Sequence, residues 1–225
     1  MSELNVMCSL AMKAAMIELA PQFEREGGRR VVLQWAGGVD IARRLRAGDT
    51  SDLVMMAGAG IDDLAKEGLV AAGSRVDLAK SKVGVAVPAG APRPDLSSAE
   101  SVKRAVLAAK KVAYSSGPSG VYLAKVFEKW NVAAGKLHQT APGVPAGEVA
   151  ARREAEIAFQ QVSELLPVKG IDYVGPLPED LQLVTVFSAG TPVKAKDAAG
   201  AKALTAFLTS AAVGGVLRSC GLEPA

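Results

Sequence analysis

The feature that most constrains the fold is the alternation of short apolar runs with amphipathic stretches of helical periodicity. Parallel strands need a crossover connection, which is usually a helix, so this order predicts βαβ units and mainly parallel sheets. We expect strands at 4–9, 29–37, 51–58, 80–90, 110–115, 156–160 and 184–190. We expect helices at 40–48, 61–70, 98–109, 120–130, 147–166 (running into the 156–160 strand) and 197–221.

A further helix is predicted directly after the first strand. Its apolar face repeats at helical spacing through Met12, Met16, Leu19 and Phe23. Pro21 interrupts this pattern, and we expect it to kink or restart the helix because proline lacks the amide hydrogen. The last predicted helix ends at a C-terminal glycine.

The strands and helices divide into two groups, which predicts two α/β lobes. We place the first lobe at 1–82 plus 188–225 and the second at 83–187, joined by a two-strand hinge near 80–90 and 184–190. Ligands of open α/β sheets bind beyond the carboxyl ends of the strands, where helices begin. A ligand cleft is therefore expected between the lobes.

Composition excludes several classes of function. Aromatic residues make up only 4% of the 225 residues, which argues against single-stranded nucleic-acid binding by stacking. The net charge of +3 is not concentrated on one basic stretch, so no nucleic-acid partner is expected. No uninterrupted apolar run is long enough for a bilayer, so no membrane insertion is expected. Cys8 and Cys220 stand at opposite ends of the chain and do not form a disulfide framework.

The junctions between strands and helices are the candidate binding sites. Ser9 ends the first strand and can cap the next helix, where its hydroxyl and the amides near Leu10 could bind an anion. Gly37 and Gly38 end the second strand and allow a ligand to approach the backbone closely. A serine cap and a glycine turn are, however, common structural features without any ligand.

The segment SSGPSG at 115–120 raises the sharpest question: it could be a linker, a nucleophile turn or an anion cradle. A strand and a helix flank it too closely for a linker, and it lacks the G-x-S-x-G spacing of a nucleophile elbow. We therefore expect an anion cradle at a helix start. Its residues are Ser115, Ser116, Gly117, Ser119 and Gly120.

Two glutamines extend the set of candidates. Gln160 and Gln161 follow an apolar strand, so their side-chain amides can either face a ligand or serve the fold. His138 is the single histidine and stands in a stretch typical of loops, which argues against a catalytic triad. No metal site and no cofactor motif is expected.

Several of these residues carry a resemblance to a known family. The segment LNVMCSLAMKAAMIELAPQF, followed by Arg44 through Gly48 to Asp52, is similar to the start of molybdate-binding-type periplasmic substrate-binding proteins. REAEIAFQQVSELLPVKG resembles a later part of a molybdate-binding-like branch. The resemblance implies the periplasmic-binding-protein type II fold, a small anionic ligand and a monomer. It carries the binding role over to Ser9 and to 115–120, whereas Gly37 and Gly38 replace the usual serine pair.

Three functions follow from the resemblance. The first is binding of a small oxyanion or carboxylate as the solute-binding component of an ABC-type uptake system, with a permease as partner. The second is isomerisation of a small polycarboxylate, because aconitate isomerase resembles the same branch; acid–base candidates are then Glu164, Cys8, Tyr122 and His138. The third is a cytosolic anion sensor. The protein is expected in the periplasm if a leader has been removed, and in the cytoplasm otherwise.

Overall fold

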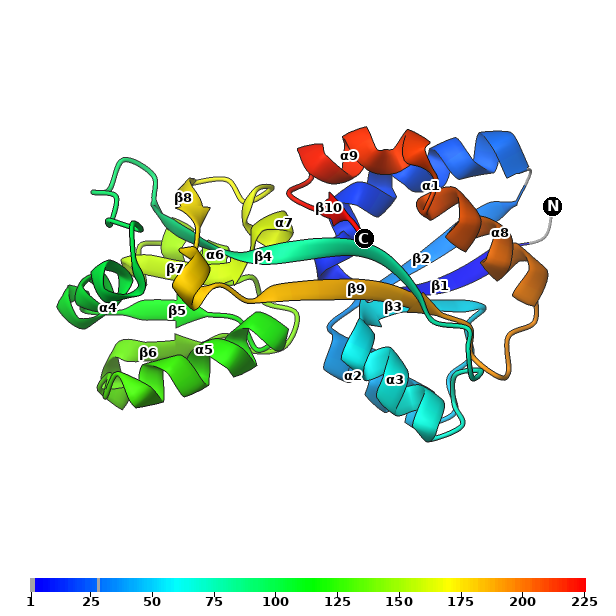
Figure 1. The fold of residues 1–225 in the computed structure, drawn as a ribbon, viewed down its shortest axis with the longest axis horizontal. Coiled ribbons are helices and arrows are strands. Elements are labelled where there is room, and N and C mark those ends of the chain that lie inside the picture. Colours follow the sequence, from blue (N-terminus) through cyan, green and yellow to red (C-terminus); the bar gives the residue numbers. More distant parts are fainter. Residues whose placement is uncertain (1–2, 28) are drawn as a thin grey trace. The chain divides into compact units, whose positions relative to one another are not determined.

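The computed structural model describes residues 3–27 and 29–225, and these form two compact units. Unit 1 comprises the chain up to Lys80 together with Val186–Ala225, and unit 2 comprises Ser81–Thr185. Two strands continue from one unit into the other: β4 (Val76–Pro88) and β9 (Val184–Gly190), both seen in Figure 1.

Unit 1 is built on strands with helices on both faces. Its elements are β1 (Glu3–Ser9), α1 (Lys13–Gly27), β2 (Arg30–Ala36), α2 (Gly38–Arg46), β3 (Leu53–Ala57), α3 (Gly58–Lys66), α8 (Ala198–Leu208), α9 (Gly214–Ser219) and β10 (Glu223–Pro224). The strand order is β2-β1-β3-β9; the first three are parallel, and β9 is antiparallel to β3. The predicted mixed, mainly parallel α/β fold is confirmed.

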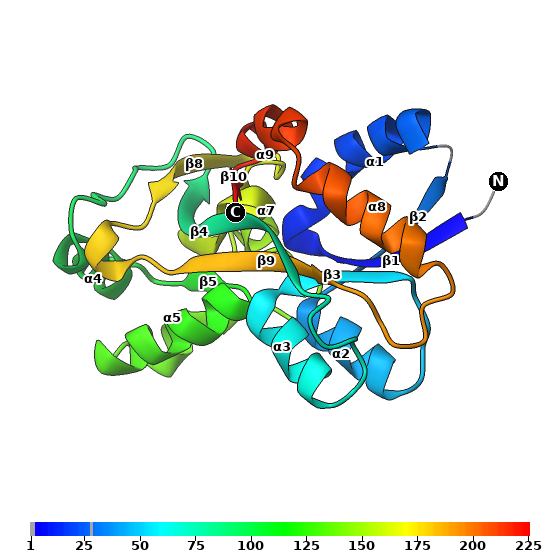
Figure 2. The ribbon, with the colours of Figure 1, turned by 45° about the vertical axis from the view of Figure 1, so that its right-hand side comes forward.

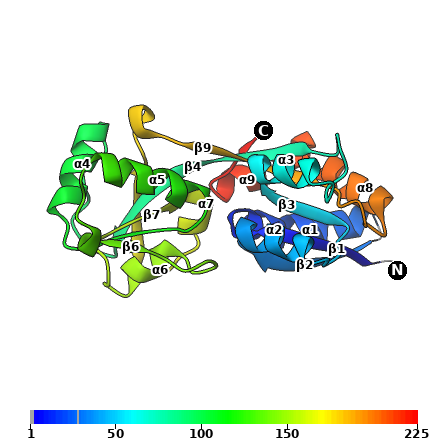
Figure 3. The same ribbon diagram turned by 90° about the horizontal axis from the view of Figure 1, so that it is seen from below.

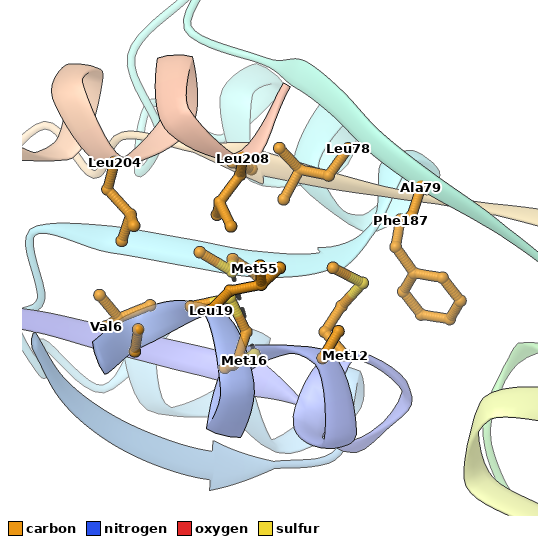
Figure 4. Close-up of a cluster of buried hydrophobic side chains, with 14 of the residues drawn as sticks. Val6, Met12, Met16, Leu19, Met55, Leu78, Ala79, Phe187, Leu204 and Leu208 are labelled. Atoms are coloured by element: carbon orange, nitrogen blue, oxygen red, sulfur yellow. Dashed lines mark hydrogen bonds between the residues drawn. The ribbon is translucent and has the colours of Figure 1, made fainter. Parts of the chain in front are cut away.

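Successive side chains of β1 point to opposite faces of the sheet, so the core of unit 1 has two layers, one on each face. Val6 and Cys8 face the cluster built with α1, α8 and α9, whereas Met7 faces the cluster built with α2 and α3. The first cluster consists mostly of aliphatic and methionine side chains from several elements, and Phe187 lies at its edge (Figure 4). A chain with few aromatic residues thus fills its core in thin layers.

Helix α1 runs without interruption through Pro21, so the predicted restart is wrong. Proline removes one hydrogen bond, to the carbonyl four residues earlier, which belongs to Ile17. Ile17 is 55% exposed, so water can bind its free carbonyl oxygen. The helix tolerates the proline because Pro21 lies on the outer face.

The C-terminal segment forms two helices instead of the single helix predicted at 197–221. Helix α8 ends at Leu208, and after Thr209–Ser210 a 3-10 turn (Ala211–Val213) leads into α9. The run Ala211–Ser219 is bent by 58° relative to α8. Thr209 contributes to the break because its hydroxyl donates to the carbonyls of Thr205 and Ala206 within the last turn. Figure 2 shows α8 beside α1, consistent with their contacts in the core.

Among the described residues, no single helix is long and apolar enough to cross a membrane. Helices α8 and α9 satisfy the criterion only as a bent pair. Their buried residues belong to the core of unit 1.

Unit 2 repeats the same architecture with fewer strands. Its elements are α4 (Ala99–Ala108), β5 (Val112–Tyr114), α5 (Pro118–Lys129), β6 (Leu137–Gln139), α6 (Ala146–Ala151), β7 (Ile157–Gln161), α7 (Val162–Leu165) and β8 (Ile171–Pro176). The strand order is β4-β7-β5-β6, with β5 parallel to both neighbours and β8 also paired to β4. Helices α4 and α5 cover one face and α6 the other (Figure 3).

Two expectations for unit 2 need correction. The stretch around His138, expected to be a loop, is the short edge strand β6, paired with β5 from Leu137 to Gln139. The helix expected from 147 ends at Ala151, and Arg153 adopts φ 59° just beyond it. This left-handed residue closes the helix and turns the chain into β7.

We predict that Leu19→Ala lowers the free energy of unfolding by about 2–5 kcal/mol, the usual loss for a fully buried leucine. Leu19 is 0% exposed within α1. The matched control is Ile17→Ala on the same helix, which should change stability little because Ile17 is mostly in water. Urea unfolding of both variants measures the difference, and equal losses would contradict the packing described here.

Candidate functional site

In unit 1, parallel pairing brings three strand-to-helix junctions to one edge of the sheet. Ser9 is in register with Ala36, and Cys8 is in register with Met55. The residues that follow β1, β2 and β3 therefore emerge at the same carboxyl edge, as expected for parallel strands.

Ser9 has a structural partner at this edge. Its hydroxyl oxygen accepts a hydrogen bond from the amide of Ala11 at 3.4 Å, which caps a short 3-10 helix that starts at Leu10. Only 8% of Ser9 is exposed. The hydroxyl hydrogen of Ser9 is still available for an anion, so the two roles are compatible.

Gly37 and Gly38 leave the start of α2 without a side-chain cap. Gly37 is the N-cap residue, and no side chain accepts from the first amides of the helix. A Cβ atom built on Gly37 would meet nothing within 4 Å, so packing does not require glycine there. The sequence at this junction offers backbone amides where a serine would offer a hydroxyl as well.

In unit 2, a second carboxyl edge collects the remaining candidates. Tyr114 is in register with Gln139 on one side and Phe159 on the other. The amide of Thr140 donates to the carbonyl of Tyr114 at 2.9 Å, which continues the ladder by one residue. Ser115, which follows β5, and Gln160, in the last part of β7, therefore lie at the same edge as Thr140.

The segment 115–120 connects β5 to α5 and contains the first residues of that helix, so the expected helix start is confirmed, while the anion cradle stays a prediction. The hydroxyl groups of Ser115 and Ser119 lie 3.0 Å apart and share one hydrogen bond, and both side chains are buried. Two hydroxyls that share one hydrogen bond retain one hydrogen for another acceptor. Ser116 is partly exposed, and Gly117 is an N-cap without a side-chain cap.

Gly120 is the residue that makes this arrangement possible. A Cβ atom at this position would lie 1.5 Å from the carbonyl oxygen of Ser115. Only glycine lets the first turn of α5 approach the end of β5 so closely. The close approach is what brings Ser119 within hydrogen-bonding distance of Ser115.

Gln160 and Gln161 point to opposite faces of β7, as alternation along a strand requires. Gln160 shares the α6 face with Ala158, and its side-chain oxygen accepts from the amide of Ala146 at 2.7 Å. Gln161 donates to the hydroxyl of Thr185 at 2.9 Å. Both glutamines thus have structural partners, and their predicted contact with a ligand stays a prediction.

Gln161 also belongs to a small group of buried, unpaired oxygens. Its side-chain oxygen and the hydroxyls of Thr140 and Ser163 form no hydrogen bond with any described residue. A fourth oxygen without a partner among the described residues, the hydroxyl of Ser51, lies in unit 1. Buried polar groups are nearly always paired, so each of these oxygens can take part in a further hydrogen bond. Thr140 and Ser163 were not predicted. The signal available was their position, since Thr140 directly follows β6 and Ser163 stands two residues after the end of β7.

Among the acid–base candidates, two are engaged elsewhere and one lies at the edge of the sheet. Cys8 is fully buried, and burial raises the pKa of its thiol far above the usual range. The hydroxyl of Tyr122 donates to the carbonyl of Leu181 at 2.9 Å, and burial raises its pKa. His138 lies on the edge strand β6 and is partly exposed.

Glu164 differs from the other three because its environment suits proton transfer near neutral pH. It lies in the first turn of α7, directly beyond the carboxyl end of β7. Burial raises its pKa to about 7, and a hydrogen bond from the side chain of Gln160 opposes the rise. A carboxyl group with this pKa exchanges a proton readily at physiological pH.

Two glycines allow α7 to pack closely against its neighbours. A Cβ atom at Gly84 would meet Tyr173 at 2.8 Å and Val162 at 3.1 Å, and one at Gly147 would meet Leu165 at 3.2 Å. Because both positions are glycine, Val162 and Leu165 of α7 approach β4 and α6 closely.

No group of three or more histidine, cysteine, aspartate or glutamate side chains suited to a metal ion occurs within 3–27 and 29–225. Cys8 and Cys220 are both free and buried in this structure. The polar groups at the sheet edge of unit 1 are hydroxyls and amides, and those at the sheet edge of unit 2 are hydroxyls, amides and one carboxyl group.

Comparison with known proteins gives a consistent picture. The sequence model of the bacterial extracellular solute-binding protein family matches residues 4–223. An aconitate isomerase from Pseudomonas sp. is 35% identical, over 98% of this chain and 87% of its own length. A molybdate-binding protein of Escherichia coli strain K12 is 26% identical, over 79% of this chain and 72% of its own length. Among solved structures, the periplasmic molybdate-binding protein of Azotobacter vinelandii has a TM-score of 0.82 and 17% identity, with 99% of each chain covered.

We predict that Gly120→Ala destabilises unit 2 by roughly 2–4 kcal/mol, the upper range for overpacking, because the methyl group would collide with the backbone. Gly135→Ala is the control, since a Cβ atom there meets nothing within 4 Å. Thermal unfolding measures both variants. A Gly120→Ala protein as stable as the control would show that the first turn of α5 can move away from Ser115.

We also predict that Glu164→Gln stabilises the protein at alkaline pH but not at pH 4. The pKa of Glu164 is raised on folding, so the native state binds more protons than the unfolded state between about pH 4.5 and pH 7. Stability contributed by the neutral carboxyl is thus lost as pH rises through this range, by about 3 kcal/mol in total for a shift of this size. Glutamine does not ionise and does not incur the loss.

Chemical denaturation at pH 4, 6 and 8 measures this difference between wild type and the variant. Glu148→Gln is the control, because Glu148 is an exposed glutamate on the neighbouring helix α6. If the difference in unfolding free energy between Glu164→Gln and wild type is the same at all three pH values, folding does not change the pKa of Glu164, and the prediction is wrong.

Proposed function

Because the chain belongs to the family of bacterial extracellular solute-binding proteins, we propose that it binds a small carboxylate and isomerises it by moving a proton. The substrate class is a small unsaturated polycarboxylate. The observation that carries the proposal is the start of α5, a cradle of amides and buried hydroxyls, in a chain that is 35% identical to an aconitate isomerase along 98% of its length.

The cradle suits a carboxylate for physical reasons. Backbone amides at the start of a helix of this length carry a partial positive charge and bind anions without a cation. The Ser115–Ser119 pair retains one hydroxyl hydrogen for a ligand oxygen. Neutral donors hold the carboxylate groups in place while leaving a neighbouring C–H bond accessible to a base.

The choice between a polycarboxylate and an inorganic oxyanion rests on the junction after β2. Gly37 and Gly38 offer amides and no hydroxyls at the start of α2. An inorganic tetrahedral oxyanion presents four oxygens close together and is best surrounded by many donors. A polycarboxylate spreads its oxygens over several carbon atoms and needs fewer donors at each point.

The second candidate is binding without turnover, as the solute-binding component of an ABC-type uptake system acting in the periplasm with a permease as partner. The family match along residues 4–223 and the likeness to molybdate-binding proteins support it. In this case the protein binds its anion and releases it chemically unchanged.

Two measurements on the purified protein separate the candidates. Proton NMR of cis- and trans-aconitate incubated with the protein is expected to show interconversion. A thermal-shift panel with both acids, citrate, molybdate, tungstate and sulfate identifies the ligand class, since a ligand at 100 times its Kd adds roughly 2.7 kcal/mol of stability.

Interconversion of the two acids supports the isomerase. Stabilisation by molybdate or sulfate, together with unchanged NMR spectra of both acids, would contradict it and favour solute binding. The variant Ser115→Ala combined with Ser119→Ala should weaken carboxylate binding about 10-fold or more, because it removes the two cradle hydroxyls.

A further inference from the structure

Lys13 is a cation at the beginning of a helix, where positive charge is electrostatically unfavourable. It is the first residue of α1 and directly follows the 3-10 turn that starts at Leu10. The amides at a helix N-terminus carry a partial positive charge, so acidic residues are favoured there and lysine is not. The residues that complete the first turn of α1 are uncharged. Lys13 therefore adds positive charge to a place that is already positive.

The ammonium group of Lys13 has no carboxylate partner in unit 1. Met16 and Ile17 stand three and four residues further along α1, the positions from which a side chain reaches its helical neighbour, and neither is charged. None of the salt bridges formed by the described residues of unit 1 includes Lys13. The side chain is exposed, so its ammonium group is accessible to a ligand.

An aromatic ring fixes the position of this ammonium group. The nitrogen of Lys13 lies 5.9 Å from the ring centroid of Trp35, within the range of a cation–π interaction. Trp35 is the penultimate residue of β2 and is in register with Cys8 of β1. The ring face takes only part of the three N–H donors of the ammonium group. Lys13 thus offers the remaining donors near the carboxyl end of β2.

Beside the ring, the chain lacks a side chain where one would fit. Gly37 has extended backbone angles, φ −67° and ψ 151°, which any residue can adopt. A Cβ atom built on it would meet no described atom within 4 Å. Because side chains alternate along an extended chain, that Cβ would lie on the same face of β2 as Trp35. Gly37 therefore leaves open space on the side of β2 that carries Trp35 and Lys13.

The other groups at the start of α2 leave this space without a competing anion. Asp40, the acidic residue in the first turn of α2, lies 3.3 Å from Arg43 and is paired with it. The first amides of α2 accept no cap from any described side chain. The junction after β2 thus combines an ammonium group, uncapped amides and open space, which together suit a carboxylate group.

We propose that Lys13, held in place by Trp35, binds one carboxylate group of the substrate and is a specificity-determining residue for polycarboxylates. The inference rests on the proposed function and deepens it by naming the cation that recognises the substrate class. The ligand is a small organic acid with at least two carboxylate groups, one of which forms a charge-assisted hydrogen bond with the ammonium group.

The arrangement of the strands explains why the subsite favours a polycarboxylate. Trp35 belongs to β2, the outermost strand in the order β2-β1-β3-β9, whereas Ser9 ends the neighbouring strand β1. Neighbouring strands lie about 4.8 Å apart, so the two junctions offer separate points of attachment. A tetrahedral oxyanion has its oxygens around one atom and needs one such point. A polycarboxylate has separate anionic groups, and the open space at Gly37 accommodates the carbon atoms between them.

The first test measures affinity by calorimetry, with trans-aconitate and the saturated tricarboxylate tricarballylate as probes. Lys13→Met removes the charge and keeps an aliphatic chain against Trp35. We expect it to weaken binding of both probes about 10-fold or more, the usual loss of a hydrogen bond to a charged group. Lys13→Arg keeps the charge and should recover most of the affinity. Lys202→Met, which changes an exposed lysine of α8, makes the same change in net charge and should bind as wild type.

The emission of Trp35 gives a second measurement that leaves Lys13 unchanged. The sequence contains two tryptophans, so Trp130→Phe makes Trp35 the single one. A carboxylate bound to the ammonium group changes the electric field at the ring, so the emission should change and saturate as trans-aconitate is added. Constant emission while calorimetry shows binding would overturn the inference, and this result decides the matter if Lys13→Met fails to fold.

Gly37→Ala tests whether the open space belongs to the ligand. The methyl group meets no described atom, so the melting temperature without ligand should stay close to that of wild type. Affinity for trans-aconitate should fall roughly 5-fold or more, because the methyl group overpacks the space that the ligand occupies.

The outcomes separate this inference from the proposed function. Wild-type affinity of Lys13→Met for both probes would overturn the inference and leave the proposed function intact, because interconversion of the aconitates is measured independently by NMR. Binding of neither probe by wild type, together with no interconversion of the aconitates, would overturn the proposed function and the inference with it.

Discussion

Parallel pairing of neighbouring strands is the constraint on which the candidate site depends. Once β1 is in register with β2 and β3, every chain segment that leaves these strands leaves at one edge. The same holds for β5 between β6 and β7 in the other unit. Residues separated by more than forty positions, such as Ser115 and Gln160, thereby become neighbours without any direct interaction in the sequence.

Close packing then determines the chemistry available at each edge. At the start of α5, Gly120 allows two buried serines to meet. At α7, Gly84 and Gly147 allow Val162 and Leu165 to pack closely against β4 and α6. In both places a glycine permits an approach that any side chain would prevent.

Most of the fold followed from periodicity in the sequence. The alternation of apolar runs and helices predicted the α/β class, and the segment 115–120 was correctly expected at a helix start. The strand β6 escaped prediction because three residues are too few to establish an alternation, and it is recognised only by its pairing with β5. The break after α8 escaped because Ala and Leu on both sides continue the helical pattern, while the interruption depends on Thr209 and Ser210.

The site was predictable to a lesser degree. Residue types identified the junctions between strands and helices as candidate binding sites. The role of each residue, however, depends on its hydrogen-bonding partners, and only the tertiary structure brings these partners together. Gln160 illustrates this: the alternation Ala158, Phe159, Gln160 places it on the α6 face, yet only the fold reveals the amide of Ala146 that fixes its orientation. Glu164 was one of four acid–base candidates of equal standing until the packing of α7 distinguished it from the others.

A binding protein and an isomerase of this kind differ by little in physical terms. A cradle of amides and hydroxyls binds an anion and leaves its bonds unchanged, since none of these donors exchanges a proton near neutral pH. Moving a proton within the bound molecule requires in addition one group whose pKa lies near the working pH. Packing can supply such a group, since burial of a carboxyl group raises its pKa and contact with water lowers it again. A solute-binding scaffold can therefore acquire or lose catalysis through the packing around a single side chain, while its strands, helices and anion cradle stay the same.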